Sequence, residues 1–231
     1  MKIALLGSAP SSRMHAPFDN PEWEIWACSA SNRGILPRSD AWFEIHATDR
    51  RAPNPKLGPY YKWLQTVQFP VYMQEKSELF PASVEYPRNE MIEEFGNMFF
   101  TSSVAWMAAL AISKLTKSTD EEKILGFWGI DMMASDEYEY QRAGCHFFIW
   151  LARNRGIDVV APGESDILNP SPLYGYQEQS PMWRKLNARG EELDGRIANL
   201  TNTVQKAQHE MAVLRGAKEG VDYALTWVKA P

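Results

Sequence analysis

The chain has 231 residues, of which 45% are hydrophobic and 23% are charged. This length suits one α/β domain with an appendage rather than two full domains. The net charge of −5 and the pI near 5.5 give no general attraction to nucleic acid or to an anionic membrane, so neither is an expected partner.

The sequence contains no targeting or membrane segment that we recognise. The apolar run in residues 1–7 is too short for the core of a signal peptide, and no run reaches the roughly 18 apolar residues of a membrane span. The two cysteines, Cys28 and Cys145, lie far apart in apolar sequence, which predicts buried thiols rather than a disulfide. We therefore expect a cytoplasmic protein.

Three apolar runs near the N-terminus predict strands over residues 2–6, 24–28 and 41–46. Each run leads into polar residues: Gly7, Ser8 and Ser11 follow the first, Asn32 follows the second, and His46 ends the third. The carboxyl ends of parallel strands share one edge of a sheet, so these side chains are candidate neighbours. The Gly7–Ser12 turn can offer backbone N–H groups to an anion or can be only a turn, and His46 can equally be an ordinary loop histidine.

The next part of the chain is less regular. Proline and arginine fill residues 48–59, which predicts a surface loop that can act as a lid. Helical spacing follows over 60–67, and a short strand with a proline over 69–73 is expected at the edge of the sheet. Residues 77–87 are expected to be irregular, and 87–95 to form a short helix.

Residues 99–142 have the strongest pattern in the chain. Thr101, Ser102 and Ser103 precede an almost uniformly apolar run, which predicts a buried helix with hydroxyl groups at its N-terminus. Those hydroxyls can bind an anion, or they can simply cap the helix. A buried strand over 124–131 then ends in Asp131.

A helix over 136–155, closed by Gly156, and a strand over 157–161 complete a βαβ unit. The fold class that we expect is therefore α/β, with a Rossmann-like, mostly parallel sheet and helices on both faces. The first turns of this helix combine acids, tyrosines and Arg142, which is typical either of a site or of an ion-paired helix start.

The C-terminal part has a different pattern. We expect an α/β domain over 1–168, a linker over 169–181, a long helix over 182–218 and a tail over 219–231. Apolar residues recur in the helix at alternating steps of four and three, as in a coiled coil. They are Leu193, Ile197, Leu200, Val204, Ala207, Met211 and Leu214. We expect homo-oligomers through 182–218, although the helix can instead dock on its own domain.

Three motifs carry a resemblance to a known group of proteins: Gly7-Ser-Ala-Pro-Ser11, the Thr101-Ser-Ser103 start of an alanine-rich helix, and the Gly129-Ile-Asp131 strand end. Residues 1–168 resemble the Rossmann-like sialyltransferase-like superfamily, which includes the MptE-like 6-hydroxymethylpterin diphosphokinases and the motility-accessory-factor proteins. The block from Glu137 to Arg142 resembles a version common among uncharacterised bacteriophage proteins. Ser8, Ala9 and Ser103 stand where these families usually have Asn, Gly and Gly.

The resemblance implies a nucleotide site. Carried over, Gly7, Ser8, Ser11, Thr101 and Ser102 would face phosphate, and Asp131 would contact ribose or position an acceptor. Asn32 would lie among these nucleotide-binding residues.

The reaction implied is group transfer from a nucleotide or nucleotide sugar. Arg142 or Tyr140 would stabilise the leaving phosphate, and His46 or His146 would act as the base. No spacing typical of metal ligands occurs, so any Mg²⁺ would arrive with the nucleotide.

Three functions remain open at this point. The first is a glycosyl or phosphoryl transferase, and the second is a non-catalytic protein that senses or sequesters a nucleotide or metabolite. The third is a structural or virion assembly protein that oligomerises through its C-terminal helix.

Overall fold

The computed structural model describes residues 1–46, 58–131, 136–163, 165, 167–168 and 181–228. The chain divides into two compact units, residues 1–169 and 170–231. Parts of the predicted 48–59 loop and 169–181 linker lie outside the described residues, as do residues 132–135 and the side chains of residues 136–139.

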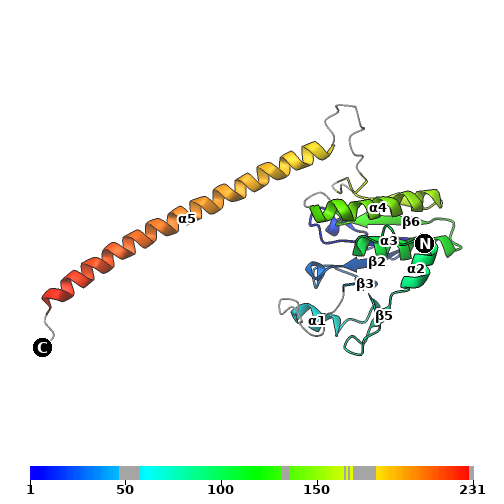
Figure 1. Cartoon of the computed structure of the whole chain (residues 1–231), viewed down its shortest axis with the longest axis horizontal. Helices are drawn as coiled ribbons and strands as arrows, with labels where there is room; N and C mark the ends of the chain where they lie inside the picture. The colour runs from blue at the N-terminus through cyan, green and yellow to red at the C-terminus, as the bar shows by residue number, and fades with distance from the viewer. Residues whose placement is uncertain (47–57, 132–135, 164, 166, 169–180, 229–231) are drawn as a thin grey trace. The chain divides into compact units, whose positions relative to one another are not determined.

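The first unit is built on a seven-stranded sheet with the order β5-β4-β3-β2-β1-β6-β7 (Figure 1). All of its strand pairs are parallel. The strands are β1 (Lys2–Leu6), β2 (Trp23–Cys28), β3 (Ala41–Glu44), β4 (Val71–Met73), β5 (Ser83–Glu85), β6 (Ile124–Trp128) and β7 (Asp158–Val160). This confirms the predicted Rossmann-like parallel α/β fold.

Helices cover both faces of the sheet, as predicted. They are α1 (Gly58–Leu64), α2 (Arg88–Phe95), α3 (Ser103–Lys117) and α4 (Asp136–Asn154), with short 3₁₀ helices η1 (Arg13–His15) and η2 (Ala30–Asn32). Alternate residues of a strand point to opposite faces, and β1 shows this clearly. Ile3 and Leu5 pack in one core with residues of α3 and α4, while Ala4 and Leu6 pack in a second core with residues of α1.

The junction of α2, α3 and α4 contains a partly buried carboxylate, Glu94. Arg155 donates to it at 2.6 Å, Ser113 donates at 2.7 Å, and the Lys117 ammonium lies 3.8 Å away. Burial alone would raise the pKa of Glu94, but the Arg155 and Ser113 hydrogen bonds and the charges of Arg155 and Lys117 lower it below its ordinary value of 4.5. The ionised form therefore stabilises the fold.

We expect Glu94→Gln to lower the free energy of unfolding by about 1–2 kcal/mol at pH 7. A carboxyl with a depressed folded pKa contributes stability above its unfolded pKa and loses it as pH falls through the folded pKa. The difference between Glu94→Gln and wild type should therefore shrink below about pH 4 in urea unfolding curves. Glu93→Gln, on the exposed neighbour, is the matched control, and an equal effect at both sites would contradict this account.

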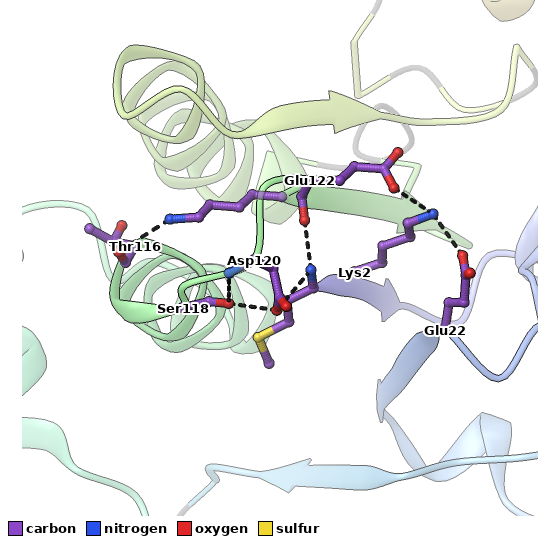
Figure 2. A network of polar contacts seen from close by, with 8 residues as sticks. Lys2, Glu22, Thr116, Ser118, Asp120 and Glu122 are labelled. Carbon is purple, nitrogen blue, oxygen red and sulfur yellow. Dashed lines mark hydrogen bonds and ion pairs between the residues drawn. The ribbon is translucent and has the colours of Figure 1, made fainter.

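Ion pairs link the chain segments at the amino ends of β1, β2 and β6 (Figure 2). Lys2 Nζ lies 2.8 Å from Glu22 and 2.8 Å from Glu122, and the Met1 ammonium lies 3.1 Å from Asp120. The hydrogen bonds that Lys2 donates to the carboxylates of Glu122 and Glu22, with Glu122 the larger cause, raise the pKa of Lys2. Charges at this edge pair with one another, whereas the candidate site lies at the opposite edge.

Two short strands differ from the prediction. β4 is not an edge strand, because it pairs with both β3 and β5. Pro70 does not prevent this, since it precedes β4 and only its carbonyl is used, accepting from Trp42 N at 2.9 Å. The predicted irregular segment 77–87 contains β5, which is too short to show a periodic pattern. Ser83, the first residue of β5, is buried because its hydroxyl bonds both the N–H and the carbonyl of Ser77.

The second unit contains one long helix, α5 (Pro181–Trp227). The predicted end at Lys218 is wrong, because the helix continues through most of the expected tail. Gly216 and Gly220 do not adopt the left-handed conformation that ends helices, and Lys218 pairs with Asp222 at 2.6 Å one turn later. Every α5 side chain that the structure describes is exposed. Among the described residues, no helix combines the length and the apolar character needed to cross a membrane.

Candidate functional site at the carboxyl edge of the sheet

The strand order reverses between β1 and β6. Strands β2 to β5 extend from one side of β1, and β6 and β7 lie on its other side. In open parallel sheets, ligands bind outside the carboxyl ends of the strands at such a reversal. Here that position is formed by the segment after β1, residues 7–13, and the segment after β6, residues 129–131.

Backbone hydrogen bonds tie these two segments together. Gly7 N donates to Trp128 O at 2.9 Å, and Ala9 N donates to Gly129 O at 2.8 Å. Gly129 N in turn donates to the buried Ser12 hydroxyl at 2.9 Å. The N–H groups of Gly7 and Ala9 are thus already bonded to protein, so Gly7 shapes the site rather than offering its N–H to phosphate.

The two glycines permit this close approach. A Cβ on Gly7 would overlap the carbonyl oxygen of Gly129 and lie 2.9 Å from Ile130 Cγ1. Gly129 has a φ of +62°, and a Cβ there would lie 2.7 Å from Arg13 Cβ and 2.8 Å from Gly7 O. Neither position has room for a side chain, and Gly129 also needs the left-handed conformation that glycine adopts easily.

Ser11 and Asp131 meet across the two segments. The Ser11 hydroxyl donates to Asp131 Oδ2 at 2.6 Å, and both residues are partly exposed. The structure therefore brings together two predicted nucleotide-binding residues that lie 120 positions apart in the sequence, at the point where the strand order reverses.

Asn32 and Arg13 lie behind this pair. The Asn32 side chain is 1% exposed, and its Nδ2 donates at 2.8 Å to both Gly7 O and Cys28 O, which joins the carboxyl ends of β1 and β2. Arg13 Nη1 donates to Ser8 O and to Asn32 Oδ1, both at 3.3 Å. Asn32 therefore supports the loop, and Ser8 contributes its carbonyl oxygen.

Arg13 is a site residue that the sequence analysis missed. The residue is partly exposed, and the two acceptors of its Nη1 group, a carbonyl and an amide oxygen, are both neutral. Its buried Nε has no hydrogen-bond partner among the described residues. A cation with neutral partners retains the ability to attract an anion. The signal was available, since Arg13 directly follows the predicted anion-binding turn.

The hydroxyls at the start of α3 contact α3 itself and α4. Ser102 accepts from Ala105 N at 3.1 Å, which is the predicted cap, and lies 3.7 Å from Cys145 Sγ. The Thr101 hydroxyl donates to Gln141 O at 3.2 Å. A Cβ on Gly144 would overlap the Thr101 hydroxyl, so α4 approaches this tip closely. These contacts are those of a structural junction between α3 and α4.

A chain of hydrogen bonds leads to His46 at the end of β3. Trp42 Nε1 donates to Tyr60 OH at 2.8 Å, and Tyr60 OH donates to Glu44 Oε2 at 2.6 Å. The other oxygen of Glu44 lies 2.7 Å from His46 Nδ1. The Glu44 side chain is 8% exposed and the His46 side chain is 77% exposed. Burial, followed by the charge of Glu44, raises the pKa of Tyr60 and keeps it a hydrogen-bond donor.

This arrangement orients an exposed imidazole with a buried carboxylate, as in many general bases. The strand is shorter than predicted, because β3 ends at Glu44 and His46 stands beyond it. The sequence analysis included His46 but missed Glu44 and Tyr60. The alternation of apolar and polar residues along β3 does not mark Glu44 as a site residue. A carboxylate is buried in a strand only where it has hydrogen-bonding or charged partners, and these could not be identified from the sequence.

The other predicted catalytic residues lie on α4. His146 Nε2 donates to Ile167 O at 3.0 Å, so this ring holds the segment after β7 against the helix. Tyr140 is 69% exposed, and Arg142 is partly buried. The side chains of residues 132–139 lie outside the described residues, and with them most of the tyrosine-rich cluster.

Two further observations complete the description of the site. Among the described residues, no group of three or more His, Cys, Asp or Glu side chains is arranged to hold a metal ion. Comparison with protein-family models, with curated proteins and with solved structures finds no match to this chain.

Proposed function

We propose that the chain is a nucleotide- or nucleotide-sugar-binding transferase whose ligand lies on Ser11, Arg13 and Asp131. The observation that carries this proposal is that Asp131, which accepts from Ser11, and Arg13, which is bound to neutral oxygens, lie on the two segments that meet where the strand order reverses. Parallel sheets bind nucleotides at such positions.

The chemistry of the cluster matches the two ends of a nucleotide. The Arg13 guanidinium suits a phosphate, because it offers several donors and a full charge. The Asp131 carboxylate suits the hydroxyls of a ribose, for which strand-end acids serve in other dinucleotide-binding folds. A Mg²⁺ ion, if the reaction uses one, would be held mainly by the phosphates of the bound nucleotide.

His46 is the proposed base. In the transfer step, His46 takes the proton of an acceptor hydroxyl while that oxygen bonds to the transferred glycosyl or phosphoryl group and the nucleotide phosphate leaves with the bonding electrons. Glu44 is a positioning residue, since it holds Nδ1 of the ring. β3 and β1 are separated by one strand, or about 10 Å, a span that one extended diphosphate-linked ligand can bridge.

Further proposals concern the family, the origin and the cellular compartment of the protein. The resemblance of residues 1–168 supports membership of the sialyltransferase-like superfamily, and the resemblance of the block from Glu137 to Arg142 supports a phage origin. Burial raises the pKa of both the Cys28 and the Cys145 thiol to about 12, which suits a protein of the reducing cytoplasm.

The proposal predicts that a nucleoside diphosphate or diphosphate sugar stabilises the full-length protein. In a thermal-shift panel of uridine, guanosine and cytidine derivatives, with Mg²⁺ and with EDTA, at least one should raise the melting temperature. Asp131→Asn keeps an acceptor for Ser11 but removes the charge, and should weaken that ligand about 10- to 100-fold in calorimetric titration.

Asp158→Asn is the matched control, because Asp158 is an exposed carboxylate at the amino end of β7. It should leave the affinity unchanged. Equal weakening by both substitutions, or no stabilisation by any nucleotide in the panel, would contradict the proposal.

An assay for turnover distinguishes a transferase from a protein that only binds and sequesters its ligand. If the protein transfers a group, His46→Ala should lower kcat by about 10²- to 10⁴-fold, whereas His209→Ala on α5 should not change it. Tight binding that both substitutions leave intact, without product, would favour the non-catalytic alternative.

A second candidate function, homo-oligomeric assembly, is favoured by α5. A 47-residue helix whose described side chains are all exposed carries a row of large apolar residues in water. Long helices in proteins owe most of their stability to packing of such a row. We therefore propose that the chain self-associates through α5.

A further inference from the structure

We infer that α5 pairs with α5 of a second copy as a parallel, in-register, two-stranded coiled coil over residues 186–225. This inference rests on the self-association proposed above and specifies its geometry. The heptad repeat extends beyond the seven apolar residues, from Leu193 to Leu214, that the sequence analysis identified. It does so because the helix itself continues to Trp227.

The a and d positions of the heptad repeat, which form the seam between two paired helices, keep one register along almost the whole of α5. The d positions are Leu186, Leu193, Leu200, Ala207, Leu214 and Val221. The a positions are Gly190, Ile197, Val204, Met211, Lys218 and Leu225. Large apolar side chains in this row are 41% exposed or more, so the row is available to a partner. A seven-residue repeat of this length indicates left-handed supercoiling rather than docking on a flat surface.

The residue types in the centre of the seam favour two strands. Ile197 and Val204 are β-branched and stand at a positions, while Leu193, Leu200 and Leu214 stand at d positions. In parallel coiled coils this distribution selects dimers, because β-branched side chains pack well in the a layer and leucine in the d layer of a two-stranded structure.

The flanking charges are complementary in the parallel arrangement. There a g residue faces the e residue five positions later in the partner helix. Arg189 would face Asp194 of the second copy, and Glu210 would face Arg215 of the second copy. No g and e positions of this register bring like charges together between Leu186 and Leu225. In the single helix, Arg189 contacts Glu192 instead, one turn away on the same chain.

The two weak positions of the seam favour an in-register pairing. Gly190 and Lys218 pack poorly at a positions, but in a parallel dimer each meets its own copy, so only two layers are affected. In an antiparallel pairing, Gly190 and Lys218 of each copy would instead face a d residue of the other copy. Four layers would then contain a poorly packing residue. A single polar a residue commonly fixes register in this way.

The charge of Lys218 has a partner outside the seam. Its ammonium lies 2.6 Å from Asp222, which stands at the adjacent e position. The side chain can therefore bury its methylene groups in the a layer while its charge remains at the solvent-exposed rim. This reduces the repulsion between the two Lys218 ammonium groups of a parallel dimer.

The first test is the mass of the full chain by light scattering, over a range of concentrations. The expected mass is that of a dimer. Leu200→Glu at a d position should weaken the dimer at least about 100-fold, because both copies lose a buried leucine. Asn202→Glu, two residues away at an outward f position, is the matched control and should change the affinity less than about threefold. Tryptophan fluorescence should show that both variants keep a folded α/β unit.

The second test gives the direction of the strands. Leu186→Cys and Val221→Cys each place a thiol at a d position near one end of the seam. In a parallel, in-register dimer each variant alone should form a disulfide-linked dimer on oxidation, because facing d residues lie within disulfide reach. The native Cys28 and Cys145 are buried and have a pKa near 12, so they should not compete.

The outcomes are distinguishable. A monomer at all concentrations overturns both the self-association and this geometry. A dimer that forms the disulfide only between Leu186→Cys and Val221→Cys chains overturns the parallel arrangement and leaves self-association standing. A trimer or tetramer overturns the two-stranded assignment alone.

Discussion

Gly7→Ala should lower the free energy of unfolding of the α/β unit by about 2–4 kcal/mol. The new Cβ would overlap the carbonyl oxygen of Gly129 and press on Ile130 Cγ1. The neighbour is backbone held by the Ala9 N to Gly129 O bond, so it cannot rotate away as a flexible side chain can. Urea unfolding followed by tryptophan fluorescence should show a lower midpoint with an unchanged slope.

Gly58→Ala is the matched control for this experiment. Gly58 begins α1, and a Cβ there meets nothing within 4 Å. The substitution should be neutral or stabilising by up to about 1 kcal/mol, since alanine restricts the unfolded chain. A loss of less than about 0.5 kcal/mol for Gly7→Ala would mean that the two segments of the site separate easily, contrary to their description as interlocked.

Asn32→Asp should be still more damaging, with an expected loss of about 3–5 kcal/mol at pH 7. The amide nitrogen of Asn32 donates to two carbonyl oxygens, Gly7 O and Cys28 O. A carboxylate has no proton for either, and it would place negative charge against both in a position that is 1% exposed. Arg13, which donates to the other side-chain oxygen, offsets only part of this penalty.

The stability that Asn32→Asp removes should become smaller as the pH falls. Burial and the two carbonyls raise the folded pKa of the introduced carboxyl above its unfolded value, so the folded state binds the extra proton. Its destabilising effect should therefore diminish as pH falls from 7 toward 4, when the protonated group can again donate one hydrogen bond. Asn154→Asp, at an exposed amide that donates to Trp150 O, is the control and should cost less than about 1 kcal/mol. A pH-independent loss for Asn32→Asp would contradict the role given to its donors.

Much of the fold could be predicted because its elements are long or fully buried. β1 and β6 are continuous apolar runs between polar turns, and α3 is apolar almost all round with Ser102 as its cap. β5 could not be found in this way, because three residues show no period and its buried residue is Ser83. The end of α5 was misplaced because the heptad residues recognised in the sequence stop at Leu214, whereas the helix continues through Gly216 and Gly220 to Trp227.

The site was partly predictable for a different reason. In a parallel sheet the residues that follow β1 and β6 lie at the same edge, so Ser11 and Asp131 could be expected at the same site from the sequence. The strand topology does not indicate which hydrogen-bond donors are already bonded to other groups of the protein. The bonds of Gly7, Asn32 and Thr101 to neighbouring backbone could therefore be seen only in three dimensions.

The most direct test of the central claim, that Ser11, Arg13 and Asp131 form a nucleotide site, is a crystal structure of the full chain with the diphosphate ligand that stabilises it most. The account predicts phosphate oxygens within hydrogen-bond distance of the Arg13 guanidinium and a ligand hydroxyl on the Asp131 carboxylate. A nucleotide bound at another edge of the sheet, with Arg13 and Asp131 unmoved and out of contact, would contradict it.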